Sequence, residues 1–229
     1  PEDMYLMPGM RVVINFAGRK MTGFVTAVHN RAPEGIELKD IINRIDDEPL
    51  FDERLLRLAE YVADSYISST GEALAKALPS GESSKLRTAA AAEIIRHNAN
   101  KLTLRQNEIY DRIVNSDRNA HLIFGITGSG KTEIYIESAR NAVSKGQSVI
   151  YLVPEIGLSA QIHERLKSVF GGNLVLYHSN LTLNQRLANW KKFYKGDALI
   201  AVGTRSAVFL QCPELGLIIV DEEHDASYK

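Results

Sequence analysis

The sequence contains only one cysteine, Cys212, among its 229 residues. A single cysteine cannot form an internal disulfide and has no cysteine partners for a zinc site, so we expect a reducing compartment and a small, buried residue at this position. Long apolar runs are missing too. None approaches the roughly 18 residues of a membrane span, and the N-terminus lacks the basic and then apolar pattern of a signal peptide. These absences predict a cytoplasmic protein.

An excess of charge of either sign is also missing, because 27 lysines and arginines stand against 28 aspartates and glutamates. Net charge therefore neither supports nor excludes nucleic-acid binding, which would have to come from local basic and backbone groups. With 45% hydrophobic residues the chain can bury a core, and its length predicts two domains or more. It begins at Pro1 and stops at Lys229 just after a charged motif, which suggests a piece of something longer.

The N-terminal part has the pattern of a small β-rich domain. In residues 10–28, MRVVINFAGRKMTGFVTAV, short runs of β-favouring residues alternate with glycine and polar turns, as in an antiparallel barrel or meander. We place this domain at residues 1–45.

Residues 46–100 are predicted to form a helical connector or linker. Apolar residues recur there at the spacing of an amphipathic helix, at Leu55, Leu58, Ala59, Val62 and Tyr66. Ser69 and Glu72 have the spacing of a capping box for a short helix that Pro79 ends. The composition of residues 80–85, SGESSK, favours a linker, and residues 86–97, LRTAAAAEIIRH, favour another helix.

From residue 121 onward, apolar runs alternate with helical stretches, and we treat residues 101–229 as one α/β lobe. The predicted strands are HLIFGI (121–126), SVIYLVP (148–154), NLVLYHS (173–179), ALIAVGT (198–204) and LGLIIVD (215–221). Helical stretches include residues 131–146 and 183–194. Continuous apolar strands predict a parallel sheet covered on both faces, and ligands of such sheets bind beyond the carboxyl ends of the strands.

The stretch GITGSGKT, residues 125–132, matches the phosphate-binding pattern G-x-x-x-x-G-K-[ST] between an apolar strand and a helix. Its glycines let backbone N–H groups close on phosphate, and the helix N-terminus favours negative charge. Lys131 would reach the β and γ oxygens of a nucleotide, and Thr132 would offer its hydroxyl to Mg²⁺. A chain of this length shows the pattern by chance only on the order of once in a hundred.

A second nucleotide motif is predicted at the end of the last apolar run. Asp221 would hold Mg²⁺ through the water shell of the metal, and Glu222 would orient and deprotonate an attacking water. His224 either couples the nucleotide state to DNA or is an ordinary polar loop residue, and the sequence leaves both open.

Gln106 has two interpretations. With Thr103 it forms the pattern of a capping box, and it also lies just upstream of the phosphate loop, where its amide could read the edge of adenine. We favour the adenine contact. The predicted nucleotide-binding residues are then Gln106, Gly125, Thr127, Gly128, Ser129, Gly130, Lys131 and Thr132.

Two further loops follow strand ends and suit a nucleic-acid backbone, because they combine backbone freedom with hydroxyl or guanidinium donors. One contains Pro154 and Glu155, and the other contains Thr204 and Arg205. Alone, each would be an ordinary βα turn.

Taken in order, these motifs resemble the first half of a superfamily 2 helicase motor of the DExH type. The segments VPEIGLSAQ (153–161), GTRSAVF (203–209) and DEEHDASYK (221–229) are more narrowly similar to those of the PriA family of bacterial replication-restart helicases. Residues 1–25, PEDMYLMPGMRVVINFAGRKMTGFV, resemble that family's N-terminal domain, which binds the 3′ end of a nascent strand.

The resemblance implies a RecA-like lobe and an ATP-dependent 3′-to-5′ DNA helicase that recognises stalled or abandoned forks and initiates primosome assembly. It implies bacterial, nucleoid-associated localisation, and primosome proteins and single-stranded DNA-binding protein as partners. Carried over by position, Lys131, Asp221 and Glu222 would be catalytic, with Mg²⁺ at Thr132 and Asp221. The family's 3′-end pocket would fall at Phe16, Gly18 and Lys39.

The sequence departs from the family pattern in several places. An aromatic and acidic segment upstream of Pro1, a winged-helix domain, the second motor lobe with its arginine fingers and the cysteine-rich zinc module are all absent from it. We therefore expect this chain to bind nucleotide and DNA but not to unwind, with zinc only in the missing C-terminal part. The alternatives are a RecG-like fork-remodelling translocase, a DNA-structure binding module with a vestigial nucleotide site, and, last, a small-molecule kinase.

Overall fold

A computed structural model describes residues 4–31, 34–35, 37–81, 101–126, 128–154 and 160–228, with Ala160 and Gln161 described by their backbone alone. Contacts divide these residues into two units. The first comprises residues up to 81 together with Ser179–Tyr194 and Phe209–Gln211, and the second comprises residues 101–178, Lys195–Val208 and the chain from Cys212 onward. The sequence-predicted domain boundaries at 45 and 100 stay predictions.

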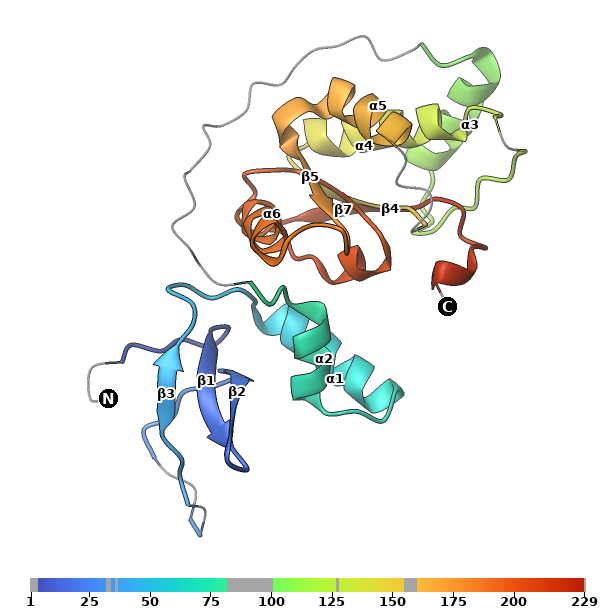
Figure 1. The fold of residues 1–229 in the computed structure, drawn as a ribbon. Helices are drawn as coiled ribbons and strands as arrows, with labels where there is room; N and C mark the ends of the chain where they lie inside the picture. The colour runs from blue at the N-terminus through green and yellow to red at the C-terminus, as the bar shows by residue number, and fades with distance from the viewer. Residues whose placement is uncertain are drawn as a thin grey trace. The chain divides into compact units, whose positions relative to one another are not determined.

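The first unit contains a small antiparallel sheet of β1 (Arg11–Phe16), β2 (Arg19–Phe24) and β3 (Ile41–Arg44), in the order β2-β1-β3 (Figure 1). Strands β1 and β2 are joined by a two-residue turn at Ala17 and Gly18, whose φ angles of 50° and 77° fit the twist of a tight hairpin. Met10, Val12 and Val25 form its buried core. The β-rich prediction is confirmed, although in the described residues these strands form neither a closed barrel nor a meander.

Two helices follow the sheet in the first unit, α1 (Glu53–Ser65) and α2 (Thr70–Ala77). The predicted capping box of Ser69 and Glu72 is present, and α2 ends before Pro79 as expected. The apolar stripe of α1 is rotated slightly from the prediction, since its buried residues are Leu55, Ala59 and Ala63. Tyr66 is 78% exposed because it caps the helix, where the chain leaves helical geometry.

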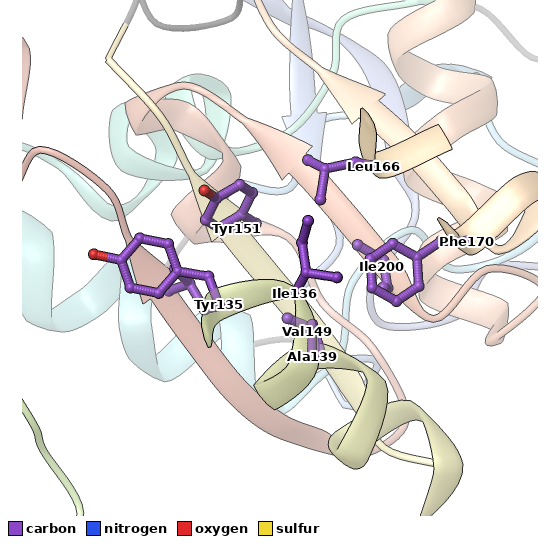
Figure 2. A pocket seen from close by; sticks show the side chains of 9 residues that line it. Tyr135, Ile136, Ala139, Val149, Tyr151, Leu166, Phe170 and Ile200 are labelled. Atoms are coloured by element: carbon purple, nitrogen blue, oxygen red, sulfur yellow. The ribbon is translucent and has the colours of Figure 1, made fainter. Parts of the chain in front are cut away.

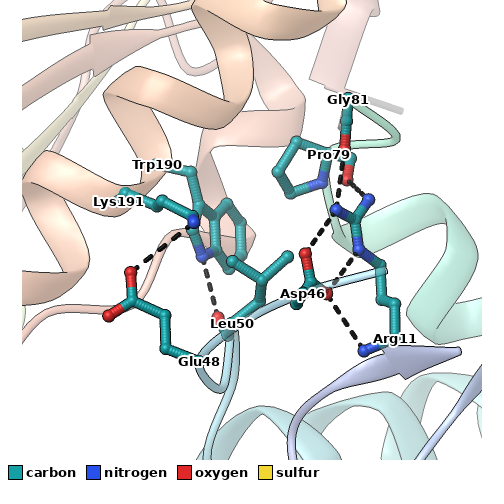
Figure 3. A network of polar contacts seen from close by, with 8 residues as sticks. All are labelled: Arg11, Asp46, Glu48, Leu50, Pro79, Gly81, Trp190 and Lys191. Atoms are coloured by element: carbon teal, nitrogen blue, oxygen red, sulfur yellow. Dashed lines mark hydrogen bonds and ion pairs between the residues drawn. The ribbon is translucent and has the colours of Figure 1, made fainter. Parts of the chain in front are cut away.

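The first unit contains a buried ion pair between Arg11 and Asp46 (Figure 3). The Arg11 guanidinium donates to both carboxylate oxygens of Asp46 at 2.8 Å, and the backbone N–H of Arg11 donates to the same carboxylate at 3.0 Å. The remaining guanidinium hydrogens reach the carbonyl oxygens of Pro79 at 2.6 Å and Gly81 at 2.7 Å. Three segments far apart in sequence are thereby joined through one side chain.

Helix α6 (Leu183–Lys195) belongs largely to the first unit, although the sequence groups it with the α/β lobe. The indole Nε1–H of Trp190 donates to the carbonyl oxygen of Leu50 at 2.8 Å, and the Lys191 ammonium lies 3.5 Å from the Glu48 carboxylate (Figure 3). Trp190 is fully buried. The segment 46–51 therefore packs against a helix that comes about 140 residues later in the chain.

The second unit contains a parallel sheet of β4 (Ser148–Leu152), β5 (Leu174–Tyr177), β6 (Ile200–Gly203) and β7 (Leu215–Val220), in the order β5-β6-β4-β7. Helices α4 (Lys131–Ser144) and α5 (Ala160–Phe170) cover one face, and α3 (Leu104–Val114) packs on α4 (Figure 1). Short 3-10 turns lie at Gly171–Asn173, Arg205–Phe209 and Ala226–Tyr228. The predicted α/β class is confirmed, and Cys212 is buried as expected.

The strand predicted at residues 121–126 is wrong. In the part of the chain that the structure describes, this segment pairs with no strand, and Leu122, Phe124 and Ile126 are 76%, 96% and 81% exposed. A β-strand needs a neighbour that satisfies its backbone N–H and C=O groups, and an apolar run alone cannot supply one.

Candidate functional site

The phosphate loop leads directly into α4. Gly128 and Gly130 have φ angles of 79° and 82°, in the left-handed region that favours glycine, and Gly130 is the N-cap residue of the helix. A Cβ atom on Gly130 would lie 2.3 Å from Nε2 of Gln106, so a larger residue cannot fit without displacement. Thr127 lies outside the described residues. The loop has the open, glycine-dependent backbone that phosphate binding requires.

Lys131 and Thr132 occupy the first turn of α4. The Lys131 ammonium donates to the loop's own carbonyl oxygens, at 2.7 Å to Gly125 and 3.3 Å to Ile126. These acceptors are neutral, so phosphate oxygens could replace them with a gain in electrostatic energy. Glu133 is also in the first turn of α4, and its carboxylate accepts two hydrogen bonds from the Arg165 guanidinium, at 3.2 and 2.8 Å. The negative charge of Glu133 is therefore balanced by Arg165.

Gln106 uses both ends of its amide within the chain. Its Oε1 accepts from the backbone N–H of Thr103 at 2.8 Å, which completes the capping box of α3, and its Nε2 donates to the carbonyl of Gly130 at 3.2 Å. The capping interpretation is therefore seen directly, and Gln106 also touches the phosphate loop. The adenine contact stays a prediction.

Asp221 follows β7 and is held by four hydrogen bonds. Its backbone N–H donates to Leu152 at 2.9 Å, and its backbone carbonyl accepts from the Tyr228 hydroxyl at 3.1 Å. Its carboxylate accepts from the Tyr151 hydroxyl at 3.0 Å and from the backbone N–H of Glu222 at 3.1 Å. The carboxylate predicted to face Mg²⁺ is thus fixed at a strand end.

Glu222 is exposed and has a φ angle of 49°, which is uncommon for a residue with a side chain and costs on the order of 1 kcal/mol. His224 lies beside it, with Nε2 3.5 Å from the Glu222 carboxylate and Nδ1 3.7 Å from that of Glu223. A strained backbone at a charged strand end is a feature often found at functional sites.

The two nucleotide motifs share one region of the second unit. Burial first, and then the negative charges of Asp221 and the two glutamates after it, raise the pKa of Tyr135 to about 12. Tyr135 lies one turn beyond Thr132 on α4, so the start of this helix is close to the carboxylates. Tyr151 and Tyr228, which contact Asp221, were missed at the sequence level, although a tyrosine within an apolar strand usually requires a buried acceptor.

The residues present fit a nucleotide-bound Mg²⁺. In the described ranges no group of three or more histidine, cysteine, aspartate or glutamate residues could hold a metal by itself. Mg²⁺ at nucleotide sites is held by one or two protein oxygens together with phosphates and water. Thr132 and Asp221 offer one hydroxyl and one carboxylate, which matches that donor set.

The predicted DNA-contacting loops meet at one edge of the parallel sheet. Strands β4 and β6 are neighbours that end together at Leu152 and Gly203, so Pro154 and Thr204 follow adjacent strand ends. Both are buried, whereas Arg205 is exposed, and Glu155 lies outside the described residues. Of this group, Arg205 has the exposed side chain, and its contact with a phosphate stays a prediction.

The predicted 3′-end residues lie around the β1–β2 turn. Phe16 is 59% exposed at the end of β1, and the Lys39 ammonium lies 5.8 Å from the centre of its ring. Gly18 is in the turn itself, where open space surrounds it. An exposed aromatic ring beside a cation is suited to a terminal base and its phosphate.

Comparison with known families places the chain among the helicases. Residues 103–229 match the DEAD/DEAH box helicase family, and because this match spans more than half of the sequence, the chain belongs to that family. Residues 1–79 match the 3′DNA-binding domain of PriA. The resemblance predicted from the sequence is confirmed, and family membership implies the use of ATP and, with the N-terminal match, DNA binding.

Several curated relatives are named replication restart protein PriA. The chain is 36% identical to that of Treponema pallidum, over 96% of this chain and 35% of the relative. It is 30% identical to that of Haemophilus influenzae, over 100% and 42%, and 53% identical over 48% of this chain to that of Helicobacter pylori. The chain thus spans about a third of the length of the first of these relatives. Among its described helices, none is long and apolar enough to cross a membrane.

Proposed function

We propose that this chain carries the DNA-end-binding and ATP-binding parts of a 3′-to-5′ DNA helicase that recognises stalled or abandoned replication forks and initiates primosome assembly. The observation that carries the proposal is the pairing of a phosphate loop with a fixed carboxylate, Asp221, near the first turns of the same helix. The relatives' name, replication restart protein, supports the fork substrate. Primosome proteins, single-stranded DNA-binding protein and a location at the bacterial nucleoid belong to the same proposal.

In the nucleotide site, Lys131 releases the loop carbonyls and pairs with the β and γ oxygens of ATP. The loop N–H groups and the start of α4 hold the same phosphates, and Gln106 contacts adenine. Mg²⁺, when bound with the nucleotide, screens the phosphate charge, and Thr132 and Asp221 are the residues that would hold it. Glu222 orients and deprotonates the attacking water.

In the DNA sites, Phe16 stacks on the terminal base of a 3′ end while Lys39 neutralises its phosphate, and Gly18 leaves room for the strand to approach. The loops at Pro154–Glu155 and Thr204–Arg205 grip a phosphate backbone without reading bases. His224, which lies beside the Glu222 carboxylate, couples the nucleotide state to DNA.

The nucleotide site is tested by calorimetry with Mg·ADP on the wild-type chain, Lys131→Ala and a control, Lys145→Ala. Loss of a charge-assisted phosphate contact should weaken binding by about 2–3 kcal/mol in Lys131→Ala alone. Lys145 caps the other end of the same helix and should have no effect. Equal affinity in all three proteins would contradict the proposal.

The 3′-end site is tested by fluorescence anisotropy on forks that end in a 3′-hydroxyl or a 3′-phosphate. The wild-type chain should prefer the free hydroxyl, and Phe16→Ala should reduce affinity for both forks by about 1–3 kcal/mol, the usual contribution of one stacked base. Met21→Ala, at another exposed apolar residue of the same sheet, is the control. If the wild-type chain binds both forks equally and Phe16→Ala does not reduce affinity, this part of the proposal is wrong.

A further inference from the structure

Asp221 receives a hydrogen bond from a buried tyrosine that no sequence motif includes. Tyr151 lies on β4, which pairs in parallel with β7, and it stands opposite Ile219, two residues before Asp221. Its side chain is 2% exposed, and its hydroxyl donates to Oδ2 of Asp221 at 3.0 Å. A buried tyrosine hydroxyl needs an acceptor, and here that acceptor is the carboxylate proposed to face Mg²⁺.

We infer that Tyr151 is a positioning residue of the nucleotide site, which fixes the Asp221 carboxylate in one orientation so that its free lone pairs face a nucleotide-bound Mg²⁺. The inference rests on the proposed function. Tyr151 holds Oδ2 while the Glu222 backbone N–H holds Oδ1, so the carboxylate cannot rotate without breaking both hydrogen bonds. A partner that holds a metal ligand in this way typically changes metal affinity by about 10–100-fold.

The position of the hydroxyl is itself restricted, because the Tyr151 ring is buried. Figure 2 shows it in the small apolar pocket between α4, α5 and the sheet, next to Tyr135. The two rings lie 6.1 Å apart at a tilted angle of 57°. A ring held by packing cannot adopt another rotamer at low cost, so the hydroxyl stays directed at Asp221.

The chemical nature of this donor also suits a metal ligand. A lysine or arginine in the same place would neutralise Asp221 and compete with Mg²⁺ for its charge. A neutral hydroxyl orients the carboxylate and leaves its full negative charge available.

The test compares Tyr151→Phe with Tyr135→Phe. Each change removes one hydroxyl group from neighbouring buried rings, but of these two hydroxyl groups the one with a hydrogen bond to Asp221 is that of Tyr151. Binding of a fluorescent ADP analogue is measured in EDTA and then over a MgCl₂ titration. Tyr151→Phe should leave Mg²⁺-free affinity unchanged and raise the Mg²⁺ concentration needed for half-maximal enhancement about tenfold. Tyr135→Phe should change neither quantity.

A purely structural role would weaken binding in EDTA and in Mg²⁺ alike, and that result would overturn the inference. A normal Mg²⁺ requirement in Tyr151→Phe would overturn the inference but leave the proposed function in place. A wild-type chain that binds no nucleotide would overturn both. Should Tyr151→Phe not fold, fluorotyrosine NMR on the wild-type chain decides. The Tyr151 resonance is identified as the one that Asp221→Asn alters. Adding MgCl₂ to the ADP complex of the wild-type chain should shift this resonance, and an unmoved resonance would overturn the inference.

Discussion

Arg11 and Lys131 both donate to backbone carbonyls, and they differ in the other groups that they contact. Arg11, in the first unit, is 3% exposed, and the carboxylate of Asp46 neutralises it within the fold. Lys131, in the second unit, donates only to neutral carbonyls of its own loop and forms no ion pair within the described part of the chain. Removing the partner of an internally cancelled charge destabilises the fold, whereas a charge that is not cancelled is available to a ligand.

The largest expected effect is on the internally cancelled charge. Arg11→Met leaves Asp46 buried and without its counter-charge, so the free energy of unfolding should fall by about 3–5 kcal/mol. Urea unfolding of the chain measures this. The control is Arg57→Met, which breaks an exposed pair with Glu53 and should leave the midpoint unchanged. Lys131→Ala should likewise leave unfolding nearly unchanged, and a large loss there would erase the contrast between the two cations.

A smaller effect is expected at the glycine that starts α4. Gly130→Ala forces a side chain into a left-handed backbone and against Gln106, and should cost about 2 kcal/mol in stability together with loss of nucleotide binding. Gly146→Ala is the matched control, since its φ angle is 77° but nothing lies within 4 Å of the added atom. Thermal unfolding of both variants separates backbone strain, which they share, from the contact with Gln106. Equal losses would mean that this contact contributes nothing.

The contact between α6 and the first unit should contribute less. Trp190→Phe keeps most of the buried ring but removes the donor to Leu50, whose carbonyl then lacks its partner, so we expect a loss of about 1–2 kcal/mol. Lys192→Ala, at an exposed position of the same helix, serves as the control in urea unfolding. If both variants unfold at the same midpoint as the wild type, this hydrogen bond does not stabilise the unit.

The smallest effect concerns Asp52, the N-cap residue of α1. Burial would raise the pKa of Asp52, but hydrogen bonds from Arg54 and Gln211 hold it below its ordinary value. A lowered pKa in the folded state means that the stabilisation is present above the unfolded-state pKa and is lost as the pH falls through the folded one. Asp52→Ala should therefore cost about 1 kcal/mol near pH 7, and the difference from wild type should shrink at an acidic pH below the lowered pKa of Asp52. Urea unfolding at both pH values measures it, and a pH-independent difference would exclude the ionic contribution.

Local patterns predicted the parts of the molecule that neighbouring residues decide. The two capping boxes, the phosphate loop and Asp221 at a strand end all depend on residues a few positions apart. Pairings across the chain escaped prediction, because Arg11 and Asp46 are 35 positions apart, and Trp190 and Leu50 are 140 apart. The incorrect strand at 121–126 has the same cause: an apolar run reveals nothing about whether a neighbouring strand is available.

The long separation between Leu50 and Trp190 also affects how the protein is made. A ribosome that adds roughly 5–20 residues per second needs on the order of 10 s to travel from one residue to the other. During that time the segment 46–51 has left the ribosome while the indole that will cover it does not yet exist. Leu50, which is buried in the finished unit, lacks its Trp190 partner throughout this interval. The nascent chain thus displays an apolar site that holding chaperones could bind until α6 is synthesised.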